Sequence, residues 1–295
     1  MNSRTRDGRL VDTYDGQGRA IRFLYEKPLG QQLLKLLIRP GVSKAAGWVL
    51  SRGVSRVLVG PFIRKNGLDM SDYPERDYRS FNDFFTRSIR PGRRQADEDA
   101  ERLIAPCDSK LTAINITPEA RFSIKGVEYT LESLLRNRAL ADRYTGGMLL
   151  LFRLSVDDYH RYCYIADGRK TDNVRIPGVF HTVSPHAAEK VPIYRENTRE
   201  YSLLETERLG TVLMMEVGAL LVGRIRNHHG AAEVKRGQEK GMFEFGGSTV
   251  VLLLERGRVR LDTDILRNSA AGEETIVKMG ERIGTAEPEC PGPVV

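Results

Sequence analysis

The sequence has no run of about 18 consecutive apolar residues, the approximate length of a helix that crosses a membrane. Its first ten residues, MNSRTRDGRL, have no apolar segment behind the arginines, so we expect no secretory signal peptide. Cysteine is scarce, and Cys107, Cys163 and Cys290 are too few and too scattered for a disulfide framework or a CxxC metal site. These absences predict a globular protein in a reducing, cytoplasmic setting.

Histidine is also scarce, and its spacing argues against a metal site. The adjacent His228-His229 pair is typical of a solvated turn, and the other three histidines, His160, His181 and His186, show no convincing ligand spacing. Aromatic residues make up only 7% of the chain, and no nucleic-acid-binding motif is present. We therefore expect neither a bound metal nor a nucleic-acid partner.

Positive charge is concentrated at one end of the chain. Residues 1–70 contain 13 Lys or Arg and 5 Asp or Glu, a balance of +8, whereas the whole chain carries +7. A basic surface at one end of a molecule is typical of a protein that docks on something acidic.

The segment 30–65 combines seven basic residues, no acidic residue and many aliphatic ones. Lys35/Arg39 and Arg52/Arg56 are each spaced to share a helix face, and Pro40-Gly41 predicts a turn between two helices. Two ordinary helices packed on the domain would explain this pattern. We favour an amphipathic anchor on an anionic membrane, where each Lys or Arg contributes about 1 kcal/mol.

From about residue 100 the pattern changes to short apolar runs separated by Gly, Asp and Pro, which predicts a β-rich core. One helix is expected over Thr130–Asp142, because its leucines recur with helical spacing. The expected strands are Arg121–Lys125, Met148–Leu154, Tyr162–Ala166, Asn173–Ile176, Thr211–Val217, Leu220–Ile225 and Thr249–Leu254. The predicted fold class is α+β, with antiparallel or mixed sheets behind an N-terminal helical, basic, membrane-facing region.

Three short segments carry residues that suit nucleophilic chemistry. Gly246-Gly247-Ser248-Thr249 combines flexible glycines with a hydroxyl group, although a bare GGST is usually only a turn. His160 follows an acidic pair and is the natural base at neutral pH, and Asp108 lies in a tight turn. A serine, a base and an orienting carboxylate are the parts of an activated nucleophile, but the sequence alone does not show that they meet.

The order of these segments resembles the phosphatidylserine decarboxylase family. Phe81-Asn82-Asp83-Phe84-Phe85-Thr86-Arg87 resembles its FxxFFxR signature, and the resemblance runs from about residue 20 to 285. The further matching motifs are Pro106-Cys107-Asp108, Ile124-Lys125-Gly126, Asp158-Tyr159-His160-Arg161, His181-Thr182-Val183, Asn197, Val217-Gly218-Ala219, Val222-Gly223, Gly246-Gly247-Ser248-Thr249 and Gly280-Glu281 with Ile283-Gly284.

The resemblance implies self-cleavage between Gly247 and Ser248. Ser248, activated by a histidine that Asp108 orients, would attack the Gly247 carbonyl, and elimination and hydrolysis would convert Ser248 into a pyruvoyl group. The products would be a large chain 1–247 and a small chain 248–295 that remain together as a heterodimer, which can assemble further into a homo-oligomer. The implied division is a membrane-associating region 1–75 and a catalytic domain 76–295.

The resemblance also implies the substrate, phosphatidylserine in an anionic membrane. The pyruvoyl carbonyl, in a Schiff base with the substrate amine, would act as an electron sink when carbon dioxide leaves. His160 is the candidate acid that protonates the resulting carbanion. The expected location is peripheral, on the cytoplasmic face of the cell membrane.

One position departs from the family pattern. Relatives commonly carry YHRxH, with the second histidine associated with self-cleavage, but here Cys163 occupies that place. Three explanations stay open: His160 serves both steps, His181 takes the role, or maturation is slow or absent. We favour the first.

Three other activities are compatible with these residues. A pyruvoyl enzyme acting on a free amino acid keeps the chemistry and changes the substrate. A lipid-binding relative that never matures is suggested by Cys163. A serine hydrolase using Asp108, His160 and Ser248 is disfavoured because no GxSxG motif surrounds the serine.

Overall fold

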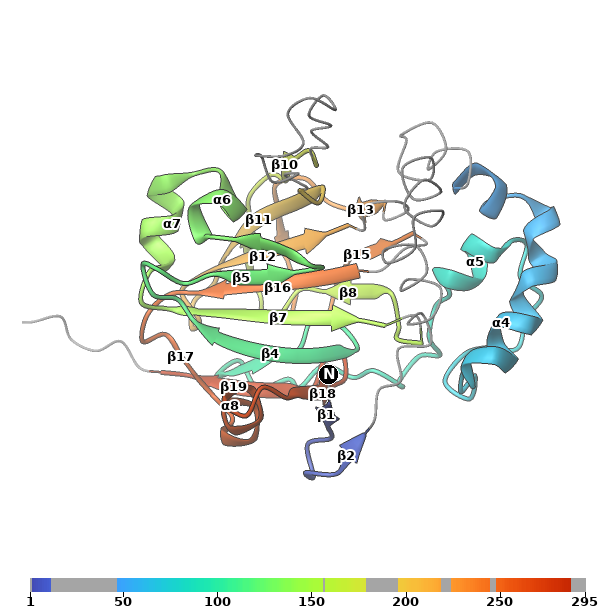
Figure 1. The fold of residues 1–295 in the computed structure, drawn as a ribbon, viewed down its shortest axis with the longest axis horizontal. Helices are drawn as coiled ribbons and strands as arrows, with labels where there is room; N and C mark the ends of the chain where they lie inside the picture. Colours follow the sequence, from blue (N-terminus) through green and yellow to red (C-terminus); the bar gives the residue numbers. More distant parts are fainter. Residues whose placement is uncertain are drawn as a thin grey trace, which may run out of the picture.

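The computed structural model describes residues 2–11, 47–155, 157–178, 196–218, 224–244 and 248–287. Its central feature is one large sheet with the strand order β14-β9-β11-β12-β16-β7-β4-β18-β1-β2, in which β10 also pairs with β11 (Figure 1). The bounds of these strands are β1 Ser3–Arg4, β2 Leu10–Val11, β4 Ser109–Asn115, β7 Met148–Leu154, β9 Gly168–Lys170, β10 Val174–Ile176, β11 Arg199–Glu205, β12 Thr211–Val217, β14 Ala232–Val234, β16 Ser248–Leu254 and β18 Glu274–Val277.

Smaller sheets and helices surround the large sheet. Two three-stranded sheets, β13-β15-β8 and β17-β19-β3, and the hairpin β5-β6 complete the β structure of the described residues. Their strands are β3 Arg102–Ile104, β5 Phe122–Ile124, β6 Val127–Tyr129, β8 Arg161–Cys163, β13 Ile225–Asn227, β15 Glu239–Phe243, β17 Val259–Leu261 and β19 Arg282–Ala286. The helices are η1 Gly53–Leu58, α4 Val59–Asn66, α5 Phe81–Phe85, α6 Leu131–Leu135, α7 Arg138–Tyr144 and α8 Thr263–Ala270.

The middle of the large sheet is antiparallel, whereas β1 runs parallel to β18, so the sheet is mixed. Strand β16 lies between β12 and β7, and all seven of its residues are buried. Its aliphatic run STVVLLL suits a strand that is covered on both faces. The predicted α+β class with a β-rich core is confirmed.

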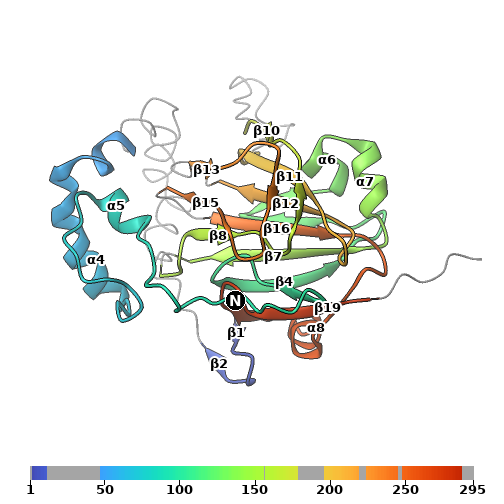
Figure 2. The same ribbon diagram turned by 180° about the vertical axis from the view of Figure 1, so that it is seen from behind.

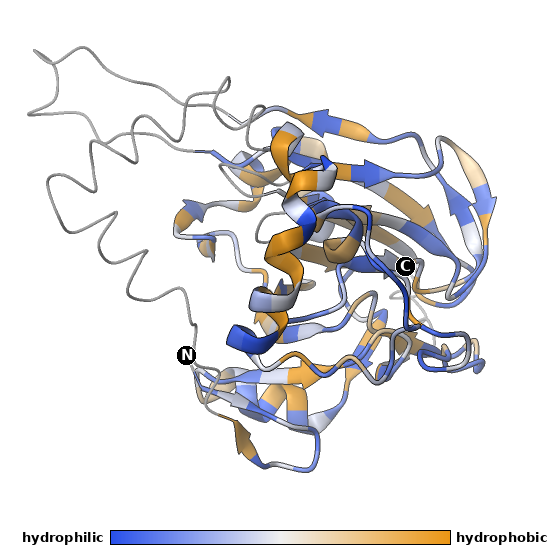
Figure 3. Cartoon of the chain, turned by 90° about the vertical axis from the view of Figure 1, so that its right-hand side faces the viewer, coloured by the Kyte–Doolittle hydropathy of each residue, from blue (hydrophilic) through white to orange (hydrophobic). Residues whose placement is uncertain are grey.

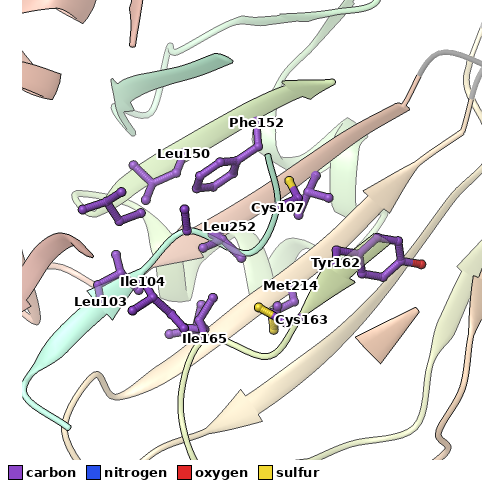
Figure 4. Close-up of a cluster of buried hydrophobic side chains, with 14 of the residues drawn as sticks. Leu103, Ile104, Cys107, Leu150, Phe152, Tyr162, Cys163, Ile165, Met214 and Leu252 are labelled. Carbon is purple, nitrogen blue, oxygen red and sulfur yellow. The ribbon is translucent and has the colours of Figure 1, made fainter. Parts of the chain in front are cut away.

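Alternate residues of β16 enter two apolar cores. Val250 and Leu252 belong to the first core, which lies between the large sheet and the segments around β3 and β8 (Figure 4). Val251 and Leu253 belong to the second core, which the β5-β6 hairpin, α6 and α7 cover. Successive side chains of β16 therefore face opposite sides of the sheet and lie in different surroundings.

The prediction of one helix over Thr130–Asp142 is wrong in one respect, because the segment forms two short helices, α6 and α7. Arg136 takes a left-handed conformation (φ 49°) and ends α6. The Asn137 side chain then accepts a hydrogen bond from Leu140 N and begins α7. Local side-chain capping therefore interrupts a segment whose leucine spacing is helical throughout.

The N-terminal helices lie together beyond one end of the strands, as both opposite views show (Figures 1 and 2). They have their own apolar cluster, formed by Val59, Leu68, Tyr78, Phe81, Phe84 and Phe85. No described helix is long and apolar enough to span a membrane.

The helical pattern predicted for residues 30–65 is only partly observed. Residues 47–50 are helical, but the chain then turns through the 3-10 helix η1. Arg52 precedes this helix and Arg56 lies within it, so the two do not share one α-helical face. Lys35, Arg39 and the Pro40-Gly41 turn lie outside the described residues.

The first residues of the chain form an arm against its last strands. Ser3 and Arg4 pair with Glu274 and Thr275 of β18, and Arg4 also forms an ion pair with Glu273. Arg6 contacts the acidic residues Asp262 (2.7 Å) and Asp264 next to α8. The first described strand, β1, therefore lies in the same sheet as β18, although more than 260 residues separate them in the sequence.

Candidate active site

Ser248 is the first residue of β16, at the end of the sheet that faces the N-terminal helices (Figure 1). It pairs in register with Leu154, the last residue of β7, and its side chain lies on the same face as Val250, toward the first core. Only 1% of Ser248 is exposed. Gly247 lies outside the described residues, so the predicted scissile bond is located here by its serine alone.

His160 lies between β7 and β8 and is held close to the chain that leads into Ser248. Its carbonyl oxygen accepts a hydrogen bond from Phe243 N (2.9 Å), and Phe243 ends β15, just before the segment that reaches Ser248. Its ring packs on Phe85 of α5 with centroids 3.9 Å apart. Helix α5 of the N-terminal helices therefore meets the connection between β7 and β8 at this histidine.

The His160 imidazole is neutral and poorly partnered. It is 1% exposed, and neither ring nitrogen forms a well-shaped hydrogen bond within the part of the chain that the structure describes. Burial, followed by the positive charge of Arg87, lowers the pKa of His160 to about 3. A neutral imidazole can accept a proton from a bound reactant, but this low pKa makes His160 a weak base while no reactant is bound.

The acidic pair before His160 is a structural tie. Asp158 binds Lys110 of β4 through both carboxylate oxygens (2.9 and 2.7 Å), and it accepts a hydrogen bond from Ser155 N (2.6 Å). Burial raises the pKa of Asp158 to about 6, although Lys110 opposes the rise. The ion pair between Asp158 and Lys110 fixes the turn that carries His160.

Asp108 is buried at the start of β4, but its bonded partners are not histidines. Arg94 donates two hydrogen bonds to its carboxylate (2.8 and 2.7 Å), Met279 N donates a third (2.9 Å) and Lys278 Nζ lies 3.3 Å away. Burial alone would raise the pKa of Asp108, but these partners hold it below its usual value. Asp108 is therefore ionised and firmly held.

Cys163 lies beside the turn that carries Asp108. Its backbone N–H donates to the carbonyl of Pro106 (2.8 Å), two residues before Asp108. Its side chain lies in the first core (Figure 4), and burial raises the pKa of its thiol to about 12. The structure thus brings position 163, rather than His160, against the aspartate turn, and it does so with a thiol that stays protonated. His181 lies outside the described residues.

No chemical role was expected for the segment around Phe85 and Arg87. The ring of Phe85 packs on the ring of His160. Arg161, the residue after His160, donates two hydrogen bonds to the carbonyl of Thr86, from Nη2 (2.7 Å) and from Nε (3.0 Å). An arginine two residues after the Phe84-Phe85 pair was the available signal, because a buried arginine needs a special environment. Among the described residues no group of three His, Cys, Asp or Glu could hold a metal ion.

Comparison with known proteins gives one consistent family. The family model described as "Phosphatidylserine decarboxylase" matches residues 81–285. The chain is similar to "Phosphatidylserine decarboxylase proenzyme 2" of Clostridium acetobutylicum, with 44% identity over 265 residues, 90% of this chain and 91% of the relative. It is also similar to the "Phosphatidylserine decarboxylase proenzyme" of Fusobacterium nucleatum (38% identity, 91% of each chain) and of Desulfitobacterium hafniense (38%, 90% of this chain and 91% of the relative).

Proposed function

Because the chain belongs to the phosphatidylserine decarboxylase family, we propose that it cuts itself between Gly247 and Ser248 and then converts phosphatidylserine into phosphatidylethanolamine and carbon dioxide. The word "proenzyme" in the relatives' names fits a chain that is made as a precursor. The observation that carries the proposal is the position of Ser248, which is buried at the start of β16. Ser248 follows Phe243 by five residues, and the Phe243 N–H donates a hydrogen bond to the carbonyl of His160.

The cleavage uses atoms of the chain alone. The Ser248 hydroxyl oxygen attacks the Gly247 carbonyl carbon, and the peptide C–N bond breaks to give an ester and a free amine at position 248. Elimination then breaks the ester C–O bond, which releases a chain ending in the Gly247 carboxylate and leaves dehydroalanine. Addition of water and loss of ammonia leave a pyruvoyl group at the start of a 48-residue chain.

The residues around position 248 suit such a group. The pyruvoyl carbonyl supplies the electron sink that loss of carbon dioxide requires. The uncommitted nitrogens of His160 suit the transfer of a proton to and from the reacting centre, and burial keeps competing water away from it. In this proposal His160 serves both cleavage and turnover, since the Cys163 thiol is too weak an acid to form a useful thiolate.

Asp108 supports this centre as a fixed negative charge. Its bonds to Arg94 and Met279 hold the Pro106 turn, and this turn binds the β8 strand that follows His160. We therefore assign Asp108 a positioning role. Replacing it with asparagine should slow cleavage and turnover together, because both steps depend on the placement of His160.

Intact mass spectrometry of the purified protein tests the function. The expected result is two chains, 1–247 and a small chain from 248 that lacks a free amino terminus, and only one chain for Ser248→Ala. Release of carbon dioxide from phosphatidylserine should then require the cut form. A single uncut wild-type chain after long incubation would overturn the proposal and favour the lipid-binding relative.

We further propose that the N-terminal helices dock on an anionic membrane. Val54 and Val57 are 73% and 74% exposed and Trp48 is 60% exposed, and apolar bands are visible on this side of the molecule (Figure 3). Arg52 stacks on Trp48 at 4.3 Å, which pairs a basic with an apolar group. Such a face beside His160 would present lipid headgroups to the site. Vesicle flotation tests it: Trp48→Ala with Val57→Ser should weaken binding, and normal binding by this variant would contradict the docking face.

A further inference from the structure

Arg87 is a buried cation without a carboxylate partner in the described residues. It is 2% exposed, and Lys110, Lys240 and Arg199 are likewise buried cations. Lys110 is paired with Asp158, Lys240 with Glu216, and Arg199 with Glu196. Arg87 differs from all three, because no carboxylate of the described residues pairs with it and two aromatic rings cover its guanidinium.

The aromatic surroundings satisfy the faces of the guanidinium but not its donors. Arg87 lies over the rings of Tyr73 (4.2 Å) and Phe84 (4.7 Å). Nη1 donates a long hydrogen bond to the carbonyl of Phe84 (3.4 Å), the guanidinium also interacts with the Tyr73 hydroxyl, and Nε has no partner in the described part of the chain. An arginine has five N–H donors, and burying them unpaired is costly unless an anion completes the site.

This cation lies next to the candidate catalytic histidine. Phe85 packs on the His160 ring, Arg161 binds the Thr86 carbonyl, and Tyr73 also contacts the ring of Tyr159 at 6.3 Å. Two segments far apart in the sequence, 85–87 and 159–161, are thus tied together. An anion bound by Arg87 would therefore lie beside the reacting centre.

The substrate carries two anionic groups, a carboxylate and a phosphodiester, and a bound arginine would affect the reaction differently at each. The carboxylate loses its charge as carbon dioxide leaves, so an arginine bound to it would stabilise the starting state more than the transition state and would slow the reaction. The phosphodiester keeps its charge throughout, and the planar fork of an arginine matches phosphate oxygens. Binding energy at the phosphodiester can position the serine headgroup without any such penalty.

We propose that Arg87 binds the phosphodiester of the substrate headgroup and thereby selects a phospholipid over a free amino acid. This inference rests on the proposed decarboxylation. It adds a role in substrate binding to the effect that Arg87 already has on the pKa of His160.

The test compares Arg87→Gln with Arg87→Lys and with the control Arg90→Gln, an exposed arginine nearby that loses the same charge. Each cut enzyme is assayed with soluble dihexanoyl phosphatidylserine, with glycerophosphoethanolamine as a competing ligand. We expect the cut form of Arg87→Gln to lose about 10- to 100-fold in kcat/KM, mainly through KM, and to lose inhibition by glycerophosphoethanolamine. Arg87→Lys should recover part of both, and Arg90→Gln should match the wild type.

Unchanged KM and inhibition in Arg87→Gln would overturn the inference. If Arg87→Gln does not fold, nuclear magnetic resonance of arginine side chains in the cut wild type gives the answer. The Arg87 Nε–H signal should move with glycerophosphoethanolamine and not with ethanolamine, and a signal that ignores both would overturn the inference. A wild-type chain that never cuts or never releases carbon dioxide would instead refute the proposed function.

Discussion

The neutral, buried His160 predicts a specific loss of stability in acid. Its pKa is about 3 in the folded protein, whereas an unfolded histidine has its ordinary value of 6.5. Burial is the main cause, and Arg87, Lys125 and Lys110 act in the same direction against a smaller opposing effect of the Asp158 backbone. Above pH 6.5 the imidazole is neutral in both states, so its full contribution to stability is present.

As the pH falls below 6.5, the unfolded chain binds a proton that the folded chain cannot bind until about pH 3. Stability from this group is therefore lost over that window. Each pH unit below 6.5 costs about 1.4 kcal/mol, so the loss by pH 5 is about 2 kcal/mol. In His160→Gln this contribution is absent, because glutamine does not titrate.

The experiment uses Ser248→Ala as the background, so that the protein is one uncut chain and unfolding can be reversible. Urea unfolding at pH 7 and pH 5, followed by circular dichroism, gives the free energy of unfolding with and without His160→Gln. The difference between the two proteins should shrink by about 2 kcal/mol from pH 7 to pH 5. Equal pH dependence in both would show that burial does not hold His160 neutral in acid.

Three further substitutions separate the other roles. Cys163→Ser should leave the rate of chain cutting within about twofold and lower stability by about 1–3 kcal/mol, as a buried hydroxyl would; abolished cutting in a folded protein would make Cys163 a participant. Phe85→Leu should reduce kcat about tenfold by loosening the ring that packs on His160, measured as carbon dioxide release at saturating substrate, and an unchanged kcat would refute that contact's importance. Arg6→Ala should lower the free energy of separating the cut chains, obtained from urea titrations, by about 1–2 kcal/mol, whereas the exposed Arg9→Ala should not; equal free energies would contradict stabilisation by the N-terminal arm.

Much of the sheet could be predicted because the sequence of each strand is sufficient to indicate it. The runs Met148–Leu154 and Thr211–Val217 are strands with the predicted bounds, and the strand predicted from Thr249 begins one residue earlier, at Ser248. Each is a short aliphatic run between turn residues, so local information is sufficient. The split at Arg136 was missed because a single left-handed residue and one cap outweighed helical spacing.

The contacts of the site could not be predicted, because they join segments far apart in the chain. Nothing near Asp108 in the sequence indicates that Arg94 and Lys278 neutralise it. The poorly bonded ring of His160 and the incompletely paired guanidinium of Arg87 likewise result from burial and packing, which spacing does not reveal. The family resemblance supplied the names of the site residues, whereas the structure supplied their neighbours.

The position of β16 has a consequence for the order of events in the cell. The proposed cut falls at the start of a strand that has β7 on one side and β12 on the other, both from the larger product, and β18 is likewise enclosed by β4 and β1. The bond can react only after these strands have assembled around it, so the precursor must fold first and become active second. Two genes encoding the separate products would lose this sequence of steps, and a misfolded copy would never gain a reactive carbonyl.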